Sequence, residues 1–308
     1  MASPSPVPSS VTTVLSLKKR SLVPAKWAET VRTVGMKQCR EAGLSLAYAF
    51  ASDDYAQYVV SSDDNGADTD DCSSTDGEGG GGGGGGCTLS SATDEEKWRL
   101  HVDILTYTVA SHCMSGLVTT VGPEFDSVAL WYARLFVVLD TTKKEVPPGK
   151  HLDGWWTQLR SGAWRLYFQL SEEGKKRYFQ EILPLLHDTK AEVLGDREQD
   201  AWYLVFLGTK PNSQGRGYAA RLLRDAMGKA DSENRPMYLE SSSQTNIAYY
   251  KKFGFEVKRE ISLGRGPAPV RLWIMVREPH APSSKVTYTS SPPNVKKFSA
   301  GGLGRLLG

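Results

Sequence analysis

The chain has 308 residues, 40% of them apolar, which is enough for one large domain with a hydrophobic core and tails. Its formal net charge of +2 is nearly neutral, which gives no indication of nucleic-acid binding. The four cysteines show neither a CxxC pair nor metal-ligand spacing, and no apolar run is long enough for a transmembrane helix. Composition therefore argues against a disulfide framework, a metal site and a membrane span.

Three segments are predicted to be disordered. Residues 1–25 are rich in Ser and Pro, and residues 279–308 in Ser, Pro and Lys. Residues 61–93 combine Asp and Ser with an unbroken glycine run, and such a segment cannot bury enough apolar surface to offset its ordering entropy. The N-terminal residues lack the order of a secretory signal, so the cytoplasm is the expected location, with a transit peptide as the alternative. The folded domain is expected at 26–278.

The first half of this domain is predicted to contain two helical segments followed by a β-hairpin. Trp27–Tyr58 is mostly helical in pattern and is closed by the Asp53-Asp54 pair. Residues 98–110 favour a helix, although their apolar residues are too dense for the period alone to decide. Residues 116–122 and 127–131 are bounded by turn residues and predict two paired strands.

Residues 132–146 have the character of an insertion between the hairpin and Pro147. The alternative is a genuine extra strand and loop. Beyond them, two helices that end near His187 carry aromatic residues at helical spacing. Most of these are expected in the core, with a few lining an acceptor pocket as the alternative. The residues are Trp155, Trp156, Trp164, Tyr167, Phe168, Tyr178 and Phe179.

A strand, a glycine loop and a helix follow. The β-rich run from Trp202 to Leu207 predicts a buried strand ended by Gly208, and apolar residues at helical spacing follow the loop. The loop between them is Gln214-Gly215-Arg216-Gly217-Tyr218-Ala219. Free N–H groups and the helix dipole at this point predict an anion site, and glycines let the backbone approach a pyrophosphate. Arg216 can add a charge-assisted contact.

Two other phosphate loops fit less well. The NTPase loop requires a Lys-Ser/Thr pair that is missing here. The dinucleotide pattern is partly met by Gly215, Gly217 and Ala220, with Glu240 about 20 residues further on. However, a polar linker containing Pro211 separates the strand from the glycines, and too little chain follows for a doubly wound sheet. A glycine turn without a ligand remains the plain alternative.

The loop and the segments after it resemble the GCN5-related N-acetyltransferase family, whose loop pattern is Q/R-x-x-G-x-G/A. The matching residues are Gln214, Gly217 and Ala219 in the loop, then Asn246, Tyr250 and the Gly254-Phe255 pair. Within the family the chain is most similar to puromycin N-acetyltransferase and a group of fungal relatives. The resemblance implies the α/β acyl-CoA N-acyltransferase fold: a mixed, largely antiparallel sheet, splayed between the Trp202 and Met237 strands and flanked by helices.

The resemblance also implies acetyl-CoA as co-substrate, with no metal. Its pyrophosphate would lie on the N–H groups of Gln214–Ala219, and its pantetheine arm along Leu207-Gly208-Thr209, where a backbone N–H near Leu207 could polarise the thioester. Asn246 would contact the cofactor. Tyr250 would protonate the departing thiolate, because a phenol with a pKa of about 10 is protonated at neutral pH. The alternative for Tyr250 is a packing role, although Tyr249 is expected to be the core residue.

The general base is less well defined. Glu240 ends a predicted strand and could act on the substrate ammonium directly or through a water, while a purely structural carboxylate is the alternative. His101 and Asp103, on an earlier strand, are reserve candidates.

The predicted function is transfer of an acetyl group to a primary amine of a small molecule, with neither nucleic acid nor membrane as a partner. A protein lysine or N-terminal acetyltransferase and a non-catalytic acyl-CoA-binding module are the alternatives. The sequence gives no indication of the oligomeric state.

Overall fold

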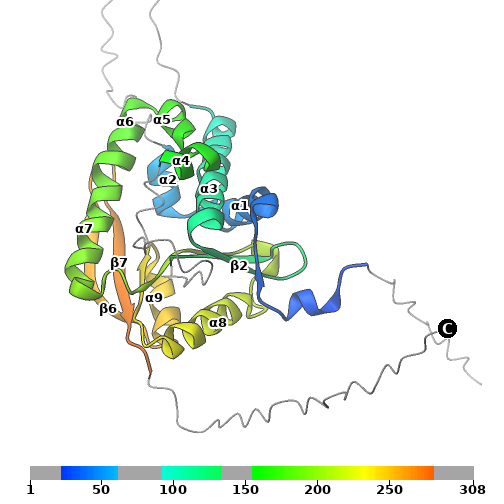
Figure 1. Cartoon of the computed structure of the whole chain (residues 1–308). Helices are drawn as coiled ribbons and strands as arrows, with labels where there is room; N and C mark the ends of the chain where they lie inside the picture. The colour runs from blue at the N-terminus through cyan, green and yellow to red at the C-terminus, as the bar shows by residue number, and fades with distance from the viewer. Residues whose placement is uncertain (1–21, 62–91, 133–154, 281–308) are drawn as a thin grey trace, which may run out of the picture.

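The computed structural model describes residues 22–61, 92–132 and 155–280. Apart from a few residues at their edges, the segments predicted as disordered (1–25, 61–93 and 279–308) and the suspected insertion at 132–146 lie outside these ranges. In the part of the chain described, seven strands form one sheet in the order β1-β2-β3-β4-β5-β7-β6. Helices cover both faces of the sheet (Figure 1).

The strands are β1 (Arg32–Thr33), β2 (Leu117–Val121), β3 (Ser127–Tyr132), β4 (Trp202–Thr209), β5 (Met237–Ser241), β6 (Glu256–Leu263) and β7 (Val270–Arg277). The α-helices are α1 (Cys39–Ala49), α2 (Asp54–Val60), α3 (Asp94–Ser115), α4 (Trp155–Ser161), α5 (Leu166–Gln169), α6 (Glu172–Lys175), α7 (Leu183–Leu194), α8 (Tyr218–Ser232) and α9 (Gln244–Lys251). A π-helical turn over Lys176–Ile182 joins α6 to α7.

The predicted sheet is confirmed. The hairpin of β2 and β3 pairs Leu117 with Trp131, and every neighbouring pair is antiparallel except β4 with β5. That parallel pair holds together over only three register positions, which end at Leu204 and Leu239. Beyond them β4 continues beside β3 and β5 continues beside β7, so the sheet opens between its two middle strands.

The two faces of the sheet carry different helices. On one face, α8 buries Leu222, Leu223, Ala226 and Ala230 against β4 and β5, and Tyr250 of α9 joins the same cluster. On the other face, α1 and α3 pack on β2 and β3, while α2 and the helices from α5 to α7 pack on β5, β6 and β7. The open end of the splay therefore lies between two helical layers.

The helix predicted over Trp27–Tyr58 is wrong in its detail. A short strand, β1, precedes α1, and α1 ends at Ala49. Asp53 begins a second helix instead of closing the first, because its side chain accepts hydrogen bonds from the N–H groups of Tyr55 and Ala56. This is an ordinary N-cap: an Asp side chain satisfies N–H groups that have no partner in the first turn.

The expectation that most of the aromatic residues on the later helices are buried is also wrong. Trp156, Trp164, Tyr167, Phe168 and Phe179 are exposed within the described part of the chain. The helices there are short and irregular, and they attach to the core through aliphatic residues, chiefly Leu166, Leu170 and Ile182. The rings instead contact one another at the surface, as Tyr167 does with Phe168 and with Phe179.

Candidate active site

A cavity occupies the splay between β4 and β5. It has a volume of about 100 Å³ and draws its lining from both strands and both helical layers. Four residues predicted from the sequence, Leu207, Glu240, Asn246 and Tyr250, lie on its wall. The other lining residues are Phe50, Asp53, Tyr55, Leu186, Tyr203, Leu204, Val205, Phe206, Leu239, Ser241, Ser242 and Leu272.

A β-bulge in β4 reorients its backbone at this cavity. Trp131 pairs with Leu204 and Leu130 with Phe206, so Val205 has no partner on β3. Before the bulge, the Trp202 N–H donates to Pro236, on the β5 side. After it, the Lys210 N–H donates to Asp126, on the β3 side.

Backbone N–H groups alternate in direction along a strand. Counting back from Lys210, the N–H groups of Phe206 and Gly208 point to β3, and those of Leu207 and Thr209 point into the open side of the splay. Without the bulge, the alternation set by Trp202 would have turned the Leu207 N–H towards β3. The unpaired edge of β4 therefore presents N–H groups at Leu207 and Thr209 beside the cavity.

Glu240 places a carboxyl in a poorly solvated position on β5. Burial raises its pKa to about 7, while the neighbouring phenols of Tyr203 and Tyr238 and the charge of Lys190 act in the opposite direction. Its Oε1 atom and the Tyr238 hydroxyl are buried with no hydrogen-bond partner among the described residues. Such unpaired atoms are rare in native interiors and often mark functional positions.

Tyr250, not Tyr249, is the more buried of the two adjacent tyrosines on α9, so the expectation that Tyr249 is the core residue is wrong. Tyr250 is 9% exposed, and its ring packs on Phe255 and on Tyr249, each with ring centroids 5.8 Å apart. Burial, with a smaller effect from Tyr249, raises its pKa, so the phenol stays protonated at neutral pH. It lines the same cavity as Glu240.

The predicted phosphate loop lies between β4 and α8. Gly215 and Gly217 both have φ of +75°, a conformation in which a side chain is strained, and Gly217 immediately precedes the first residue of α8. The start of the loop is fixed to the residue before β3, because the buried Ser213 hydroxyl donates a hydrogen bond to Asp126 at 2.8 Å. The exposed backbone here fits a phosphate group.

The remaining predicted cofactor residues have distinct environments. Arg216 is exposed, and its side chain reaches back to the Asn212 carbonyl at 3.3 Å. The Tyr218 side chain is buried in the cluster between α8 and the sheet, so only its backbone is available to a ligand. Gly208 has a packing reason to be glycine, since an added Cβ would come within 2.8 Å of Ala49 in α1.

The two reserve bases lie on helix α3, not on a strand, and neither lines the cavity. His101 is buried, and its Nε2 lies 3.1 Å from the Ala47 carbonyl in α1. Asp103 accepts a hydrogen bond from Gln169 at 2.6 Å. Both residues join α3 to neighbouring helices, so their positions indicate structural roles.

Sequence reasoning missed Asp53, Ser242 and Tyr55. Asp53 accepts a hydrogen bond from the Ser242 hydroxyl at 2.6 Å while its other oxygen caps α2. The first turn of α2 is thereby fixed to the end of β5, and Tyr55 is placed on the cavity wall. The Asp-Asp pair in front of an apolar run is a recognisable N-cap signal, but its connection to Ser242 cannot be seen from the local sequence.

In residues 22–61, 92–132 and 155–280, no helix is both long and apolar enough to span a membrane. The same ranges contain no cluster of three or more His, Cys, Asp or Glu side chains placed to hold a metal ion.

Comparison with known proteins found a matching domain family and a relative with substantial sequence identity. Residues 187–257 match the model of the Acetyltransferase (GNAT) domain. The chain is 38% identical over 205 residues to the uncharacterized N-acetyltransferase C550.08 of Schizosaccharomyces pombe, an alignment that covers 66% of this chain and 76% of that protein.

Two solved structures are similar at low identity. A structure of histone acetyltransferase HPA2 and related acetyltransferase from Corynebacterium glutamicum matches with a TM-score of 0.46 and 14% identity, over 82% of this chain and 98% of that one. Arylalkylamine N-acetyltransferase 2 from Aedes aegypti matches with a TM-score of 0.45 and 13% identity, over 81% of this chain and 98% of that one.

The family assignment rests on the S. pombe relative, because its identity is high and most of its length is aligned. The matched GNAT domain spans β4, the glycine loop, α8, β5 and α9, and it contains eleven of the sixteen residues that line the cavity. The chain belongs to the GCN5-related N-acetyltransferase (GNAT) family and is an acyltransferase that uses acetyl-CoA to acetylate an amine.

Proposed function

We propose that the protein transfers the acetyl group of acetyl-CoA to a primary amine of a small molecule, with Glu240 as general base and Tyr250 as general acid. The observation that carries this proposal is that both side chains line one cavity at the β4/β5 splay, beside the free edge of β4. A base, an acid and a backbone donor are the groups that acetyl transfer to an amine requires.

Glu240 removes the proton from the acceptor ammonium, directly or through a water. A pKa of about 7 leaves this carboxyl partly deprotonated at neutral pH while keeping it a stronger base than an ordinary glutamate. The Leu207 N–H donates to the thioester carbonyl, where negative charge develops during attack. The neutral amine attacks the carbonyl carbon, and as the C–S bond breaks Tyr250 donates its proton to the leaving thiolate. The second proton that the nitrogen loses restores the phenol.

The cofactor lies along the edge of β4 and on the glycine loop. The N–H groups of the loop, from Gln214 to Ala219, bind the pyrophosphate, and Arg216 adds a charge-assisted contact. Gly208 and Thr209 contact the pantetheine arm through their backbone, and Asn246 contacts it from α9. The left-handed conformations of Gly215 and Gly217 support this placement, because they leave the loop without a side chain at the points of close approach.

The small-molecule acceptor and the cytosolic location are part of the same proposal. The cavity beside Glu240 is small, about 100 Å³, so it admits the amine end of an acceptor and not a bulky group. Cys39 and Cys113 are free thiols, as is usual in a reducing compartment.

A thiol-release assay with acetyl-CoA and a panel of primary amines and peptides tests the proposal. We expect turnover with small primary amines, and loss of that turnover in Glu240→Gln with CoA affinity unchanged by calorimetry. Turnover confined to peptides would identify a protein acetyltransferase. CoA binding without turnover on any amine or peptide would identify a non-catalytic module.

A further inference from the structure

A second cavity adjoins the candidate active site. It has a volume of about 490 Å³ and lies between α2 and the loop that joins β6 to β7, residues 264–269. Ser242 lines both cavities, and Asp53 of the first is followed in the chain by Asp54 of the second. We call this second cavity the α2 groove. Its volume is in the range of small-molecule sites.

Apolar atoms make up more of the wall of the α2 groove than polar atoms do. Half of the twelve lining residues are apolar or aromatic: Tyr58, Pro267, Ala268, Pro269, Val270 and Trp273. The other half are polar: Asp54, Gln57, Ser61, Arg177, Ser242 and Arg271. The two cationic side chains on the wall already have acidic partners: Arg177 lies 3.6 Å from Glu173, and Arg271 lies 3.6 Å from Glu260. Asp54 has no ion-pair partner among the described residues, so the groove offers a mainly apolar surface with three uncharged polar side chains and one unpaired acidic group.

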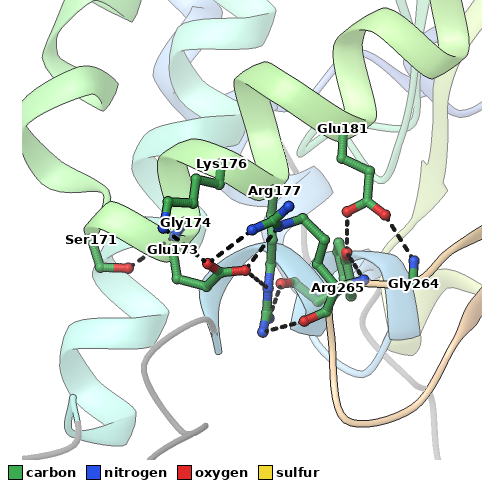
Figure 2. A network of polar contacts seen from close by, with 9 residues as sticks. Ser171, Glu173, Gly174, Lys176, Arg177, Glu181, Gly264 and Arg265 are labelled. Carbon is green, nitrogen blue, oxygen red and sulfur yellow. Dashed lines mark hydrogen bonds and ion pairs between the residues drawn. The ribbon is translucent and has the colours of Figure 1, made fainter.

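A polar network fixes one wall of the groove (Figure 2). Arg177 is 1% exposed and donates hydrogen bonds to the carbonyls of Tyr58 at 3.0 Å and Arg265 at 3.3 Å. Glu181 accepts a hydrogen bond from the Gly264 N–H at 2.8 Å and another from the Tyr58 hydroxyl. The π-helical turn carries both Arg177 and Glu181, and so ties the β6–β7 loop to α2.

The same network continues through the loop itself. The Arg265 N–H donates to the Tyr58 hydroxyl at 3.0 Å, and its guanidinium pairs with Glu173 at 3.0 Å. The loop and the helix are therefore held before any ligand arrives. Because the loop and the helix are already fixed, the protein loses little conformational entropy when a ligand binds between them.

The chemistry of the groove disfavours two other kinds of acceptor. A polyamine would need several unpaired carboxylates, and only Asp54 meets this condition among the described residues of the wall. A peptide bound in an extended form would need backbone donors. Pro267 and Pro269 have no N–H to offer.

We propose that the α2 groove binds the body of the acceptor while its amine lies at Glu240, and that it selects a primary amine carried on an apolar body about the size of an aromatic ring. This inference rests on the proposed function, since it places the reacting amine in the first cavity. Short amines, polyamines and peptides are disfavoured because they leave the apolar wall in contact with water.

Steady-state kinetics with 4-phenylbutylamine and butylamine test the inference, because the two amines differ only by the phenyl ring. We expect kcat/KM to be about 30-fold higher for 4-phenylbutylamine, the effect of burying one phenyl group. Spermidine and a tripeptide with a free N-terminus should both react more slowly than 4-phenylbutylamine.

An occluding variant locates the effect in the groove. Ala268 is exposed, so Ala268→Trp can fill the groove without disturbing the core. The ratio of kcat/KM between the two amines should fall from about 30 to below about 5. Ser262→Trp is the matched control, since Ser262 is exposed on β6 and does not line the groove, and it should keep the wild-type ratio.

The outcomes separate this inference from the proposed function. Equal kcat/KM for the two amines, or an unchanged ratio in Ala268→Trp, overturns the inference and leaves the proposed function standing. If neither amine is acetylated but another small primary amine is, the inference is overturned and the proposed function stands. If no primary amine of the panel is acetylated, the proposed function fails, and calorimetry with 4-phenylbutylamine in the presence of CoA tests whether the groove binds this amine. Binding that is lost in Ala268→Trp then supports the groove, and absent or equal binding overturns it.

Discussion

The proposed cofactor side of the splay is built from one continuous stretch of chain, whereas the proposed acceptor side joins residues that are far apart. β4, the glycine loop and α8 follow one another from Trp202 to Ser232. On the acceptor side, the Ser242 hydroxyl donates to Asp53 across 189 positions, and the Arg265 N–H donates to Tyr58 across 207. This difference suggests that the acetyl-transfer chemistry is encoded locally, while the choice of acceptor depends on long-range packing.

Glu240 lies in the cavity between the two sides, and Glu240→Gln should lower activity more than any other substitution. We expect kcat/KM to fall about 10²-fold or more, because a general base contributes roughly that factor. In the wild type, kcat/KM should rise with pH and level off above about 7, since burial raises the pKa of Glu240 to about 7. The variant should lose this dependence. A wild-type profile that is flat through pH 7 would remove Glu240 from the role of base.

The same substitution has an opposite effect on stability, which distinguishes a lost base from a lost fold. The pKa of Glu240 is raised on folding, so the folded state binds this proton more tightly than the unfolded state. The wild type therefore loses stability as pH rises from about 4.5 to about 7. Glu240→Gln should have a higher Tm than the wild type at pH 8, and the difference should shrink at pH 4. A variant that is less stable at both pH values would indicate a structural role for the carboxyl.

Tyr250→Phe should have the next largest effect. It removes the phenol that is proposed to protonate the thiolate while leaving the packing on Phe255 in place. We expect kcat to fall about 10-fold or more, with little change in the Kd for CoA. Tyr249→Phe is the matched control on the same helix and should leave kcat near wild type. Equal effects of the two substitutions would mean that Tyr250 acts through packing.

Local patterns predicted β4, the glycine loop and α8 well because each of these elements has a sequence signal. The apolar run of β4, the glycines and the apolar spacing of α8 predict a strand, a loop and a helix without any knowledge of distant residues. The acceptor side has no such signal. The hydrogen bond from Ser242 to Asp53 and the burial of Arg177 depend on partners that only the folded chain brings close. The exposed rings of Tyr167 and Phe168 were misassigned for the same reason, since helical spacing does not reveal whether a face finds a partner.

Gly217→Val tests whether the cofactor side depends on local backbone geometry. A β-branched residue at φ of +75° is strained by about 1–2 kcal/mol, and relief of that strain would move the N–H groups at the start of α8. We expect the Kd for CoA to rise about 10-fold. Gly228→Ala is the control within the same helix, where an added Cβ meets nothing within 4 Å, and it should raise stability by about 1 kcal/mol with the Kd unchanged.

Ser242→Ala should have the smallest effect on the kinetic constants. It tests directly whether the acceptor side can be altered without altering the cofactor side. It removes the hydrogen bond between the end of β5 and Asp53 but leaves the cap of α2 in place. Losing this hydrogen bond costs about 1 kcal/mol, which should raise the KM for the amine about 5-fold. The Kd for CoA should stay unchanged, because the Ser242 hydroxyl bonds to Asp53 and not to the glycine loop. Ser243→Ala, which alters the neighbouring half-buried serine, should leave both constants unchanged, because its hydroxyl contacts Thr245 and not Asp53. If Ser242→Ala weakens CoA binding as much as amine binding, the two sides are coupled, and acceptor choice cannot be assigned to long-range packing alone.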